Sequence, residues 1–122
     1  MVVIDNFSWN PLGLTSIRHE QLLCSNMNFF IRQGRLQIFK MTSADYLKKV
    51  YQGEKISLVF IDADHSYQGV ISDIQVAEAL NTVIVAGDDY SFAGVKKAVD
   101  EQYGSLVQVI GDMWWVDRRK IK

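Results

Sequence analysis

The chain has 122 residues, of which 48% are hydrophobic and 22% charged, and its formal net charge at pH 7 is −1. This length suits a single domain, and the balanced charge gives no electrostatic preference for nucleic acid or for an anionic membrane surface. The single cysteine, Cys24, excludes an internal disulfide and a cysteine-based metal site, and the lack of a signal-peptide pattern or a ~20-residue apolar run indicates a cytoplasmic protein.

Apolar runs alternate with helical patterns through the first half of the chain. The pattern predicts a short buried strand at Val2–Ile4 and a helix over residues 16–33, which Gly34 ends as a left-handed cap. The next strand is predicted at Leu36–Phe39, and a short helix at Ser43–Tyr51 follows it. The first half therefore contains two strand–helix units.

The second half continues the same alternation. The clearest buried strand is Ser57–Ile61, and a helix over residues 67–80 follows it. Another apolar strand, Thr82–Ala86, precedes a helix at Phe92–Tyr103. Strands that are apolar throughout and alternate with helices are typical of a parallel sheet with helices on both faces.

The last segment breaks this rhythm. Leu106–Ile110 and Met113–Val116 flank Gly111 and Asp112, which is typical of a tight antiparallel hairpin, and the adjacent Trp114 and Trp115 are expected to point to opposite faces. The predicted fold class is therefore α/β, with a doubly wound, mostly parallel sheet and a C-terminal antiparallel hairpin.

Polar side chains follow four predicted strands at their carboxyl ends, where sheets of this kind bind ligands. These residues are Asp5, Thr42 with Ser43, Asp62 to His65, and Asp88 with Asp89. Three of the four strand ends carry carboxylates, so the pattern predicts one common binding rim.

Asp62, Asp88 and Asp89 are candidate metal ligands, because they follow two strands whose tips converge if the strands are neighbours. Converging carboxylates repel one another unless a cation is bound or their pKa values are raised, and Mg²⁺ or Ca²⁺ prefers oxygen ligands. The alternative is that Asp88 and Asp89 cap the helix that begins near Phe92.

His65, three residues after Asp62, is the candidate general base. The alternative is a structural histidine that is hydrogen-bonded within its loop. Asp5 is placed to accept hydrogen bonds from a ribose diol. Its alternative role is a local turn with Asn6 and the residues beyond it.

Two sequence blocks, LVFIDADHSYQGVISDI and VIVAGDDYSFAGVKKAVDE, lie between Leu58 and Glu101. They resemble a bacterial branch of the class I S-adenosylmethionine-dependent methyltransferases, in which one strand ends in Ile-Asp-Gly-Asp-His-Ser-Tyr and the next in Gly-Asp-Asp-Tyr. Ala63 stands here in place of the glycine. The resemblance implies a Rossmann-like methyltransferase fold and S-adenosylmethionine as the methyl donor.

Shorter segments extend the resemblance to the cofactor contacts. VVIDNF is similar to the second strand of the family, which implies that Asp5 is the ribose ligand and that Asn6 lies beside it. KMTSADYL is similar to the turn after the third strand, where Ser43 matches a residue near the adenine and Thr42 stands where an aspartate is common. Asp62 completes the cofactor-binding residues that the resemblance implies.

The branch is similar to the catechol O-methyltransferase group in its metal pattern. Matched residue by residue, Asp62, Asp88 and Asp89 take the positions that bind Mg²⁺, and His65 takes the position of the base. This chain differs from that group at two of these positions: Asp89 stands in place of an asparagine, and His65 stands in place of a lysine. The implied reaction transfers a methyl group from the sulfonium to an oxygen of a small molecule, with Asp62 and His65 as catalytic residues.

The fold of this family begins with a strand and a glycine-rich turn, and neither precedes Val2. The resemblance therefore implies one partial domain over residues 1–122 that lacks the first strand of the order 3-2-1-4-5-7-6. Because that strand is central, we expect Val2–Ile4 to pair directly with Ser57–Ile61, or a second copy or a complementing chain to fill the gap.

A second hypothesis stays open: a truncated, non-catalytic module that binds the cofactor weakly or not at all and associates with itself or another chain. Two further alternatives fit less well. FIDADHS resembles the start of a haloacid dehalogenase-type phosphatase, but too few residues separate it from GDD for that fold. A phosphoacceptor receiver domain has its acidic pair at the first strand and does not end in a hairpin.

Overall fold

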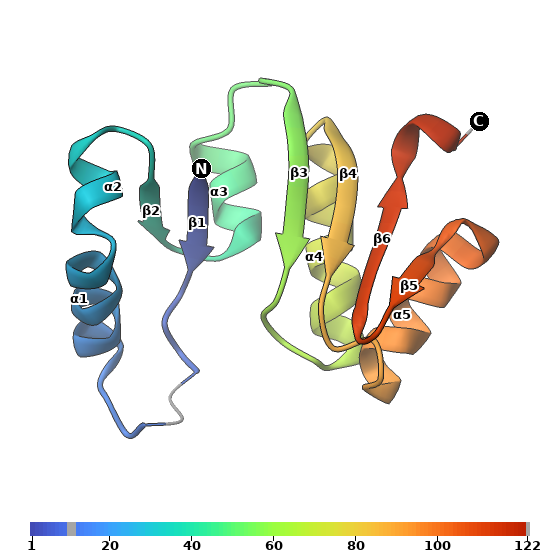
Figure 1. Cartoon of the computed structure of the whole chain (residues 1–122), viewed down its shortest axis with the longest axis horizontal. Coiled ribbons are helices and arrows are strands. Elements are labelled where there is room, and N and C mark those ends of the chain that lie inside the picture. The colour runs from blue at the N-terminus through green and yellow to red at the C-terminus, as the bar shows by residue number, and fades with distance from the viewer. Residues whose placement is uncertain (10–11, 122) are drawn as a thin grey trace. The chain divides into compact units, whose positions relative to one another are not determined.

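Residues 1–9 and 12–121 are described by a computed structural model, and they alternate between strands and helices, which confirms the predicted α/β class (Figure 1). The chain divides into two compact units, unit 1 at Met1–Val50 and unit 2 at Tyr51–Lys122, and each is described by itself. No helix of the described residues is sufficiently long and apolar to cross a lipid bilayer.

Unit 1 contains a pair of parallel strands, β1 (Val2–Asp5) and β2 (Gln37–Lys40). Their register places Asp5 opposite Lys40, at the carboxyl ends of both strands. The residues that follow β1 and β2 therefore leave the pair at the same edge, as predicted for parallel neighbours.

Threonine caps begin two helices of unit 1. Thr15 Oγ1 accepts a hydrogen bond of 3.3 Å from a backbone N–H in the first turn of α1 (Ser16–Asn26). Thr42 Oγ1 does the same at 3.1 Å for α3 (Ser43–Lys49). Each cap satisfies one of the backbone donors that a helix start leaves free, which explains where these helices begin.

The prediction of one continuous helix over residues 16–33 is wrong. The segment forms two helices, α1 and α2 (Asn28–Arg32). They meet at Met27, whose ψ of 4° departs from the helical range. Asparagine stands on both sides of Met27, and its side chain competes for the backbone hydrogen bonds of a helix interior. Gly34 follows α2 with φ of +67°, so the predicted left-handed cap is confirmed.

Unit 2 contains a four-stranded sheet in the order β3-β4-β6-β5. β3 (Ile56–Ile61) and β4 (Thr82–Gly87) are parallel, and β6 (Met113–Asp117) runs antiparallel to β4. β5 (Gln108–Ile110) pairs with β6 through a tight turn in which Gly111 has φ of +61°. The predicted parallel strands and the terminal hairpin are confirmed within this unit.

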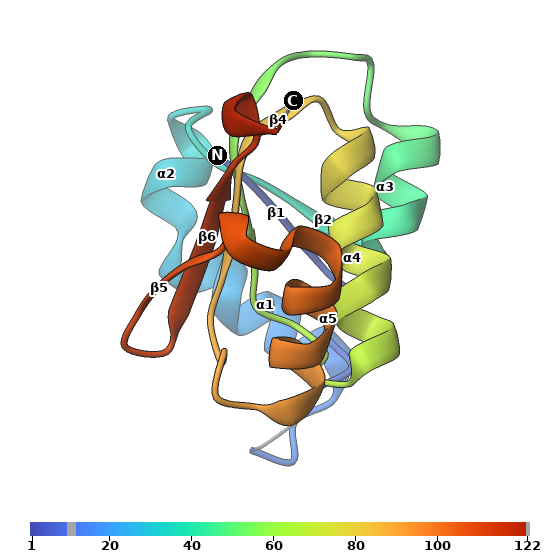
Figure 2. The ribbon, with the colours of Figure 1, turned by 90° about the vertical axis from the view of Figure 1, so that its right-hand side faces the viewer.

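α4 (Tyr67–Ala79) and α5 (Ala93–Tyr103) pack on the same face of the unit 2 sheet (Figure 2). A 3₁₀ turn, η1 (Gly104–Leu106), follows α5, so β5 begins later than the strand predicted at Leu106–Ile110. A second 3₁₀ turn, η2 (Arg118–Lys120), follows β6.

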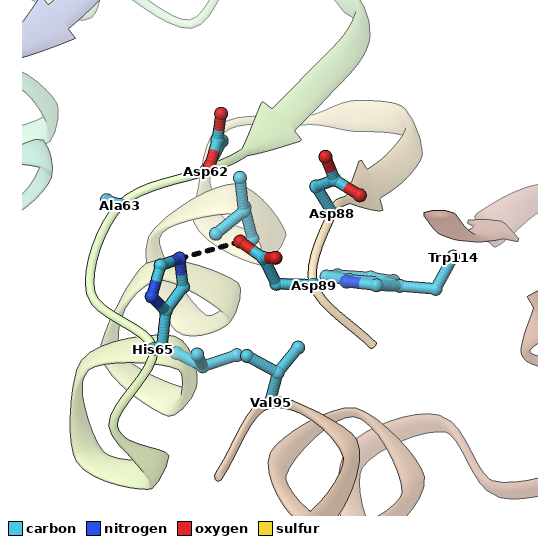
Figure 3. Close-up of a pocket in the computed structure, with 9 residues that line it drawn as sticks. Asp62, Ala63, His65, Asp88, Asp89, Val95 and Trp114 are labelled. Carbon is cyan, nitrogen blue, oxygen red and sulfur yellow. Dashed lines mark ion pairs between the residues drawn. The ribbon is translucent and has the colours of Figure 1, made fainter. Parts of the chain in front are cut away.

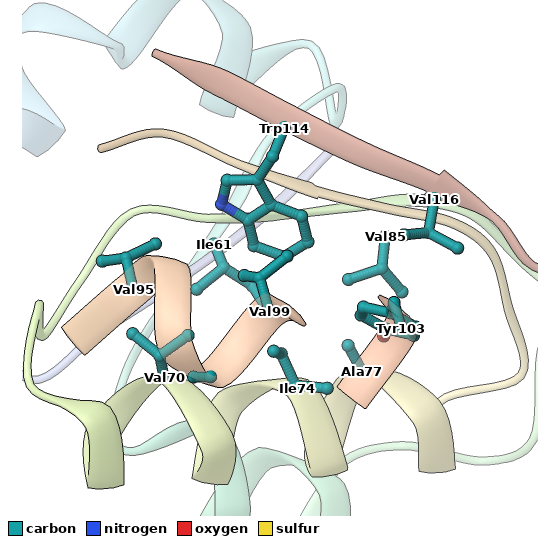
Figure 4. Packing of buried hydrophobic residues seen from close by; sticks show 11 residues of the cluster. Ile61, Val70, Ile74, Ala77, Val85, Val95, Val99, Tyr103, Trp114 and Val116 are labelled. Carbon is teal, nitrogen blue, oxygen red and sulfur yellow. The ribbon is translucent and has the colours of Figure 1, made fainter. Parts of the chain in front are cut away.

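The core of unit 2 lies between its sheet and these two helices (Figure 4). Trp114 on β6, Val85 on β4 and Ile74 on α4 are each 0% exposed. Trp115 points to the other face and is partly buried, which confirms the alternation predicted for the tryptophan pair. The buried core residues are Ile61, Val70, Ile74, Ala77, Val85, Val95, Ala98, Val99, Tyr103, Trp114 and Val116.

The opposite face of this sheet carries apolar side chains that neither α4 nor α5 covers. On β3, Leu58 is 53% exposed and Phe60 is 47% exposed. Met113 on β6 lies on the same face and is 48% exposed. Within unit 2, one face of the sheet is therefore a core and the other is an exposed apolar surface.

A polar network fastens both helices to the sheet. The Tyr103 hydroxyl donates a 2.7 Å hydrogen bond to Glu78, and Arg118 pairs with the same carboxylate at 2.8 Å. Arg118 also donates to the carbonyl of Thr82 at 2.8 Å. Burial and the neighbouring Glu78 carboxylate raise the pKa of Tyr103, so its hydroxyl stays protonated and continues to donate.

Replacing Ile74 with alanine is expected to lower the free energy of unfolding by about 2–5 kcal/mol, because the change leaves a cavity at a fully buried position. Gln75→Ala, on the exposed side of α4, is the matched control and is expected to change it by less than about 0.5 kcal/mol. Urea unfolding followed by tryptophan fluorescence measures both variants. Equal losses would contradict the core assigned to unit 2.

Candidate functional site

The carboxyl ends of β3 and β4 meet at one edge of the unit 2 sheet. Ile61 is the register partner of Gly87, and the N–H of Asp88 donates a 3.3 Å hydrogen bond to the carbonyl of Ile61. Asp62 leaves β3 at this point, and Asp88 with Asp89 leaves β4 (Figure 3). The predicted convergence of these acidic residues is therefore observed within unit 2.

His65 joins the acidic residues through a direct contact with Asp89. The distance from His65 Nε2 to Asp89 Oδ2 is 2.7 Å, with side-chain exposures of 41% and 28% (Figure 3). An ionised carboxylate only accepts hydrogen bonds, so Nε2 carries a hydrogen and donates a hydrogen bond to Asp89. The ring of Phe92 lies beside the imidazole, with 4.9 Å between centroids and 30° between planes.

Asp89 is held by an unusual backbone turn. Its φ of +60° places it in the left-handed region, which aspartate tolerates better than most residues. Its carbonyl accepts a 2.9 Å hydrogen bond from the N–H of Phe92. Asp112 lies in the hairpin turn. Its backbone carbonyl accepts a 2.9 Å hydrogen bond from the N–H of Tyr90, and its carboxylate accepts one of 2.6 Å from the N–H of Ser91. The hairpin therefore anchors the loop that presents Asp89.

The loop of His65 is fixed from both sides. Asp64 accepts hydrogen bonds from the Ser66 N–H at 2.9 Å and the Ser66 hydroxyl at 2.8 Å. The Ser66 hydroxyl in turn caps α4 by accepting the N–H of Gly69 at 3.1 Å. On the other side, a Cβ at Gly94 would lie 2.5 Å from the His65 carbonyl, so only glycine lets α5 approach this closely.

Asp62, His65 and Asp89 form a group of possible metal ligands among the described residues, since one ligand atom of each lies within 4.8 Å of the others. Asp88, which the sequence predicted as a ligand, is outside this group although it lines the same cavity. Two carboxylates and an imidazole suit a divalent cation, and the imidazole shifts the preference from Mg²⁺ toward ions such as Mn²⁺ and Zn²⁺. The donor chemistry therefore fits a metal.

A small cavity of about 10 Å³ lies among these side chains. Its polar wall consists of Asp62, His65, Asp88 and Asp89, and the buried ring of Trp114 closes it from β6 (Figure 3). Trp114 Nε1 is buried and donates to none of the described residues. The cavity therefore combines several hydrogen-bond acceptors with one unused donor.

The predicted cofactor residues Asp5, Asn6 and Ser43 belong to unit 1. Asp5 Oδ1 accepts the N–H of Phe7 at 2.7 Å, and Asn6 Oδ1 accepts the N–H of Ser8 at 2.9 Å, so both form local turns. Ser43 is the first residue of α3 and follows the end of β2 at Lys40 by three positions. The local turn that is the alternative role of Asp5 is therefore present, and it leaves Asp5 Oδ2 as a further acceptor.

Tyr67 and Tyr90, which follow the acidic residues along the chain, pack the loops of the site onto α5. The Tyr67 hydroxyl donates to Glu101 at 2.6 Å, and the Tyr90 hydroxyl donates to Asp100 at 2.6 Å. Both carboxylates lie on α5. The Glu101 carboxylate also raises the pKa of Tyr67. These tyrosines tie the loops of the site to α5.

Sequence reasoning missed three residues that build the site: Phe92, Asp112 and Trp114. The alternation rule predicts that one tryptophan of the hairpin is buried, but it does not reveal which one meets the acidic residues. Asp112 was interpreted only as a turn residue. The contacts that give these residues their roles connect segments far apart in the chain, so no local pattern carries them.

Compared with known proteins, the sequence matches no protein-family model, and no curated protein is significantly similar to it.

Replacing Asp64 with asparagine is expected to destabilise the protein in a pH-dependent way. The Ser66 N–H and hydroxyl lower the pKa of Asp64 below its ordinary value of 3.8, so its charge stabilises the fold above that pH. The stabilisation disappears as the pH falls below 3.8 through the lowered pKa. Unfolding free energies of wild type and Asp64→Asn should therefore differ most at neutral pH and converge in acid. A difference independent of pH would contradict this role.

Two variants distinguish the two possible sets of metal ligands. The sequence predicts a set that contains Asp88, whereas the structure groups His65 with Asp62 and Asp89. If Asp62, His65 and Asp89 bind a cation, His65→Ala should weaken Mn²⁺ binding about ten-fold or more, whereas Asp88→Asn should have a smaller effect. Calorimetric titration with Mn²⁺ measures both affinities. The opposite ranking would restore the set of Asp62, Asp88 and Asp89.

Proposed function

We propose that the chain is an S-adenosylmethionine-dependent methyltransferase that transfers a methyl group to an oxygen atom of a small molecule. The observation that carries the proposal is the grouping of Asp62, His65 and Asp89 at the carboxyl edge of β3 and β4. This edge is where α/β sheets bind their ligands. The same residues stand in the sequence blocks that resemble the methyltransferase branch.

Strand topology supports the proposal. If β3 and β4 are the fourth and fifth strands of the methyltransferase order, then β5 and β6 are the sixth and seventh. The order β3-β4-β6-β5 corresponds to the 4-5-7-6 part of that arrangement, including the antiparallel last strands. The parallel pair of β1 and β2 corresponds to its second and third strands.

The charge of the site favours cationic ligands. Asp62, Asp88 and Asp89 surround one cavity, and His65 is the single basic side chain in its wall. Such a site attracts a sulfonium or a divalent cation and repels a phosphate. This electrostatic preference agrees with a methyl donor whose reactive centre is positively charged.

His65 is proposed as the general base. Its Nε2 donates to Asp89, so in the neutral ring Nδ1 keeps the lone pair that accepts a proton. Asp89 sets the tautomer and the orientation of the ring, and Phe92 limits its rotation. S-adenosylmethionine, when bound, supplies the methyl group on its sulfonium. His65 would take the proton that the acceptor hydroxyl loses.

A divalent cation, if bound, would be held by Asp62, His65 and Asp89. His65 would then be a metal ligand instead of the base, and the cation would lower the pKa of the acceptor hydroxyl in its place. The cofactor residues of unit 1 stay part of the proposal: Asp5 with Asn6 for the ribose, and Ser43 near the adenine. Asp5 Oδ1 is engaged by the Phe7 N–H, so Oδ2 would receive the diol.

The alternative function is a non-catalytic module that associates with itself or a complementing chain. Two observations on unit 2 favour it. In the described sheet, β3 is an edge strand with one side unpaired. Leu58 and Phe60 on that strand are also exposed on the face that α4 and α5 leave open. Exposed apolar edges of this kind are sites of association between chains.

Isothermal titration with S-adenosylmethionine, with and without Mn²⁺, tests the proposed function. Binding in the micromolar to millimolar range is expected, and Asp62→Asn should weaken it. His65→Ala should keep the binding but lose at least about 100-fold of methyl transfer to phenolic acceptors, because it removes the base. No heat at millimolar ligand would reject the enzyme and favour the non-catalytic module. Sedimentation velocity would then detect the self-association of that module.

A further inference from the structure

Trp114 carries a buried hydrogen-bond donor that is not used within the described part of the chain. The residue is 0% exposed, and Nε1 has no acceptor among the described residues. An indole N–H only donates, so it needs an oxygen or another acceptor to offset its loss of water. Buried donors of this kind are nearly always satisfied, which points to an acceptor supplied from outside the chain.

The position of the indole directs this donor to the acidic site. A Cβ at Gly87 would lie 2.7 Å from Trp114 Cε2, the ring atom bonded to Nε1. Gly87 is the last residue of β4, directly before Asp88 and Asp89. The indole therefore lies against the carboxyl end of β4 and points from β6 toward the cavity that these carboxylates line (Figure 3).

The size and chemistry of the cavity define what it accepts. A volume of about 10 Å³ has room for one water-sized oxygen. The oxygen must accept the N–H of Trp114, and its own hydrogen has the carboxylates of Asp62, Asp88 and Asp89 as acceptors. A hydroxyl group meets both conditions. An apolar group leaves the donor unsatisfied, and an anionic oxygen is repelled by the carboxylates.

We propose that this cavity is a binding site for a single hydroxyl oxygen, and that Trp114 is the residue that positions it. Water supplies the oxygen in the free protein. The hydroxyl of the methyl acceptor replaces that water, a second step that rests on the proposed function. In this resting arrangement the neutral hydroxyl accepts one hydrogen bond from Nε1 and donates one to a carboxylate of the wall. Its hydrogen has to turn toward His65 before the proton transfer of the proposed function.

Nuclear magnetic resonance of the full chain with ¹⁵N-labelled tryptophan tests the first step. Trp9→Phe and Trp115→Phe variants assign the three indole signals. The Trp114 indole proton is expected to show a contact with a long-lived bound water and slow hydrogen exchange. An indole proton with no water contact, and a signal that phenol does not move, would overturn the proposal.

Phenol, titrated into the same sample, tests the second step, with anisole as its matched control because anisole has no hydroxyl hydrogen. Phenol should displace the bound water and shift the Trp114 signal, whereas anisole should not. Trp114→Phe should weaken phenol binding about five-fold relative to Trp115→Phe, the loss of one hydrogen bond. A Trp114 signal that keeps its water contact throughout the phenol titration would overturn this second step.

These outcomes separate the inference from the proposed function. A bound water at Trp114 in a protein that does not bind S-adenosylmethionine supports the hydroxyl site and rejects the methyltransferase. If Trp114→Phe does not fold, the spectra of the wild-type chain still decide the question, because both the water contact and the phenol shift are measured on the native residue.

Discussion

The parallel pairing of β3 with β4 is the constraint on which the candidate site depends. It brings the ends of two strands, Ile61 and Gly87, to the same edge although 25 residues of chain lie between them. Asp62 and Asp89 therefore face one cavity. The pairing closes tightly at Gly87, where a side chain would collide with the Ile61 carbonyl and the Trp114 ring. Backbone contact at this one glycine therefore connects the packing of the core to the geometry of the acidic residues.

The supports of the site come from every element of unit 2 around it. The hairpin turn holds the Asp89 loop through Asp112, and α5 approaches the His65 loop because Gly94 has no side chain. Tyr67 adds a hydrogen bond to α5 at the start of α4. Together these supports fix the loops that carry His65 and Asp89, and the imidazole itself is oriented by its contacts with Asp89 and Phe92. The role proposed for His65, that of a general base, requires such a restriction, because proton transfer depends on a fixed geometry.

Much of the fold was predictable from the sequence because its signals are local. The apolar runs of β3 and β4, the glycine cap at Gly34 and the glycine turn at Gly111 each depend on a few adjacent residues. The break at Met27 was missed because the hydrophobic period continues through it while the backbone does not. In the site, strand order was sufficient to bring Asp62 and Asp89 together. The contact between His65 and Asp89, and the indole that faces them, depend on side-chain directions that periodicity does not determine.

The left-handed backbone of Asp89 has a consequence for how this site can change over evolutionary time. Only glycine, asparagine and aspartate occupy such a conformation at little cost, so the turn restricts the substitutions that survive there. Asparagine differs from aspartate by one unit of charge and almost nothing in shape. A lineage carrying this loop can therefore adjust the electrostatics of its acidic edge by a single conservative replacement, without disturbing the folding of the sheet below it.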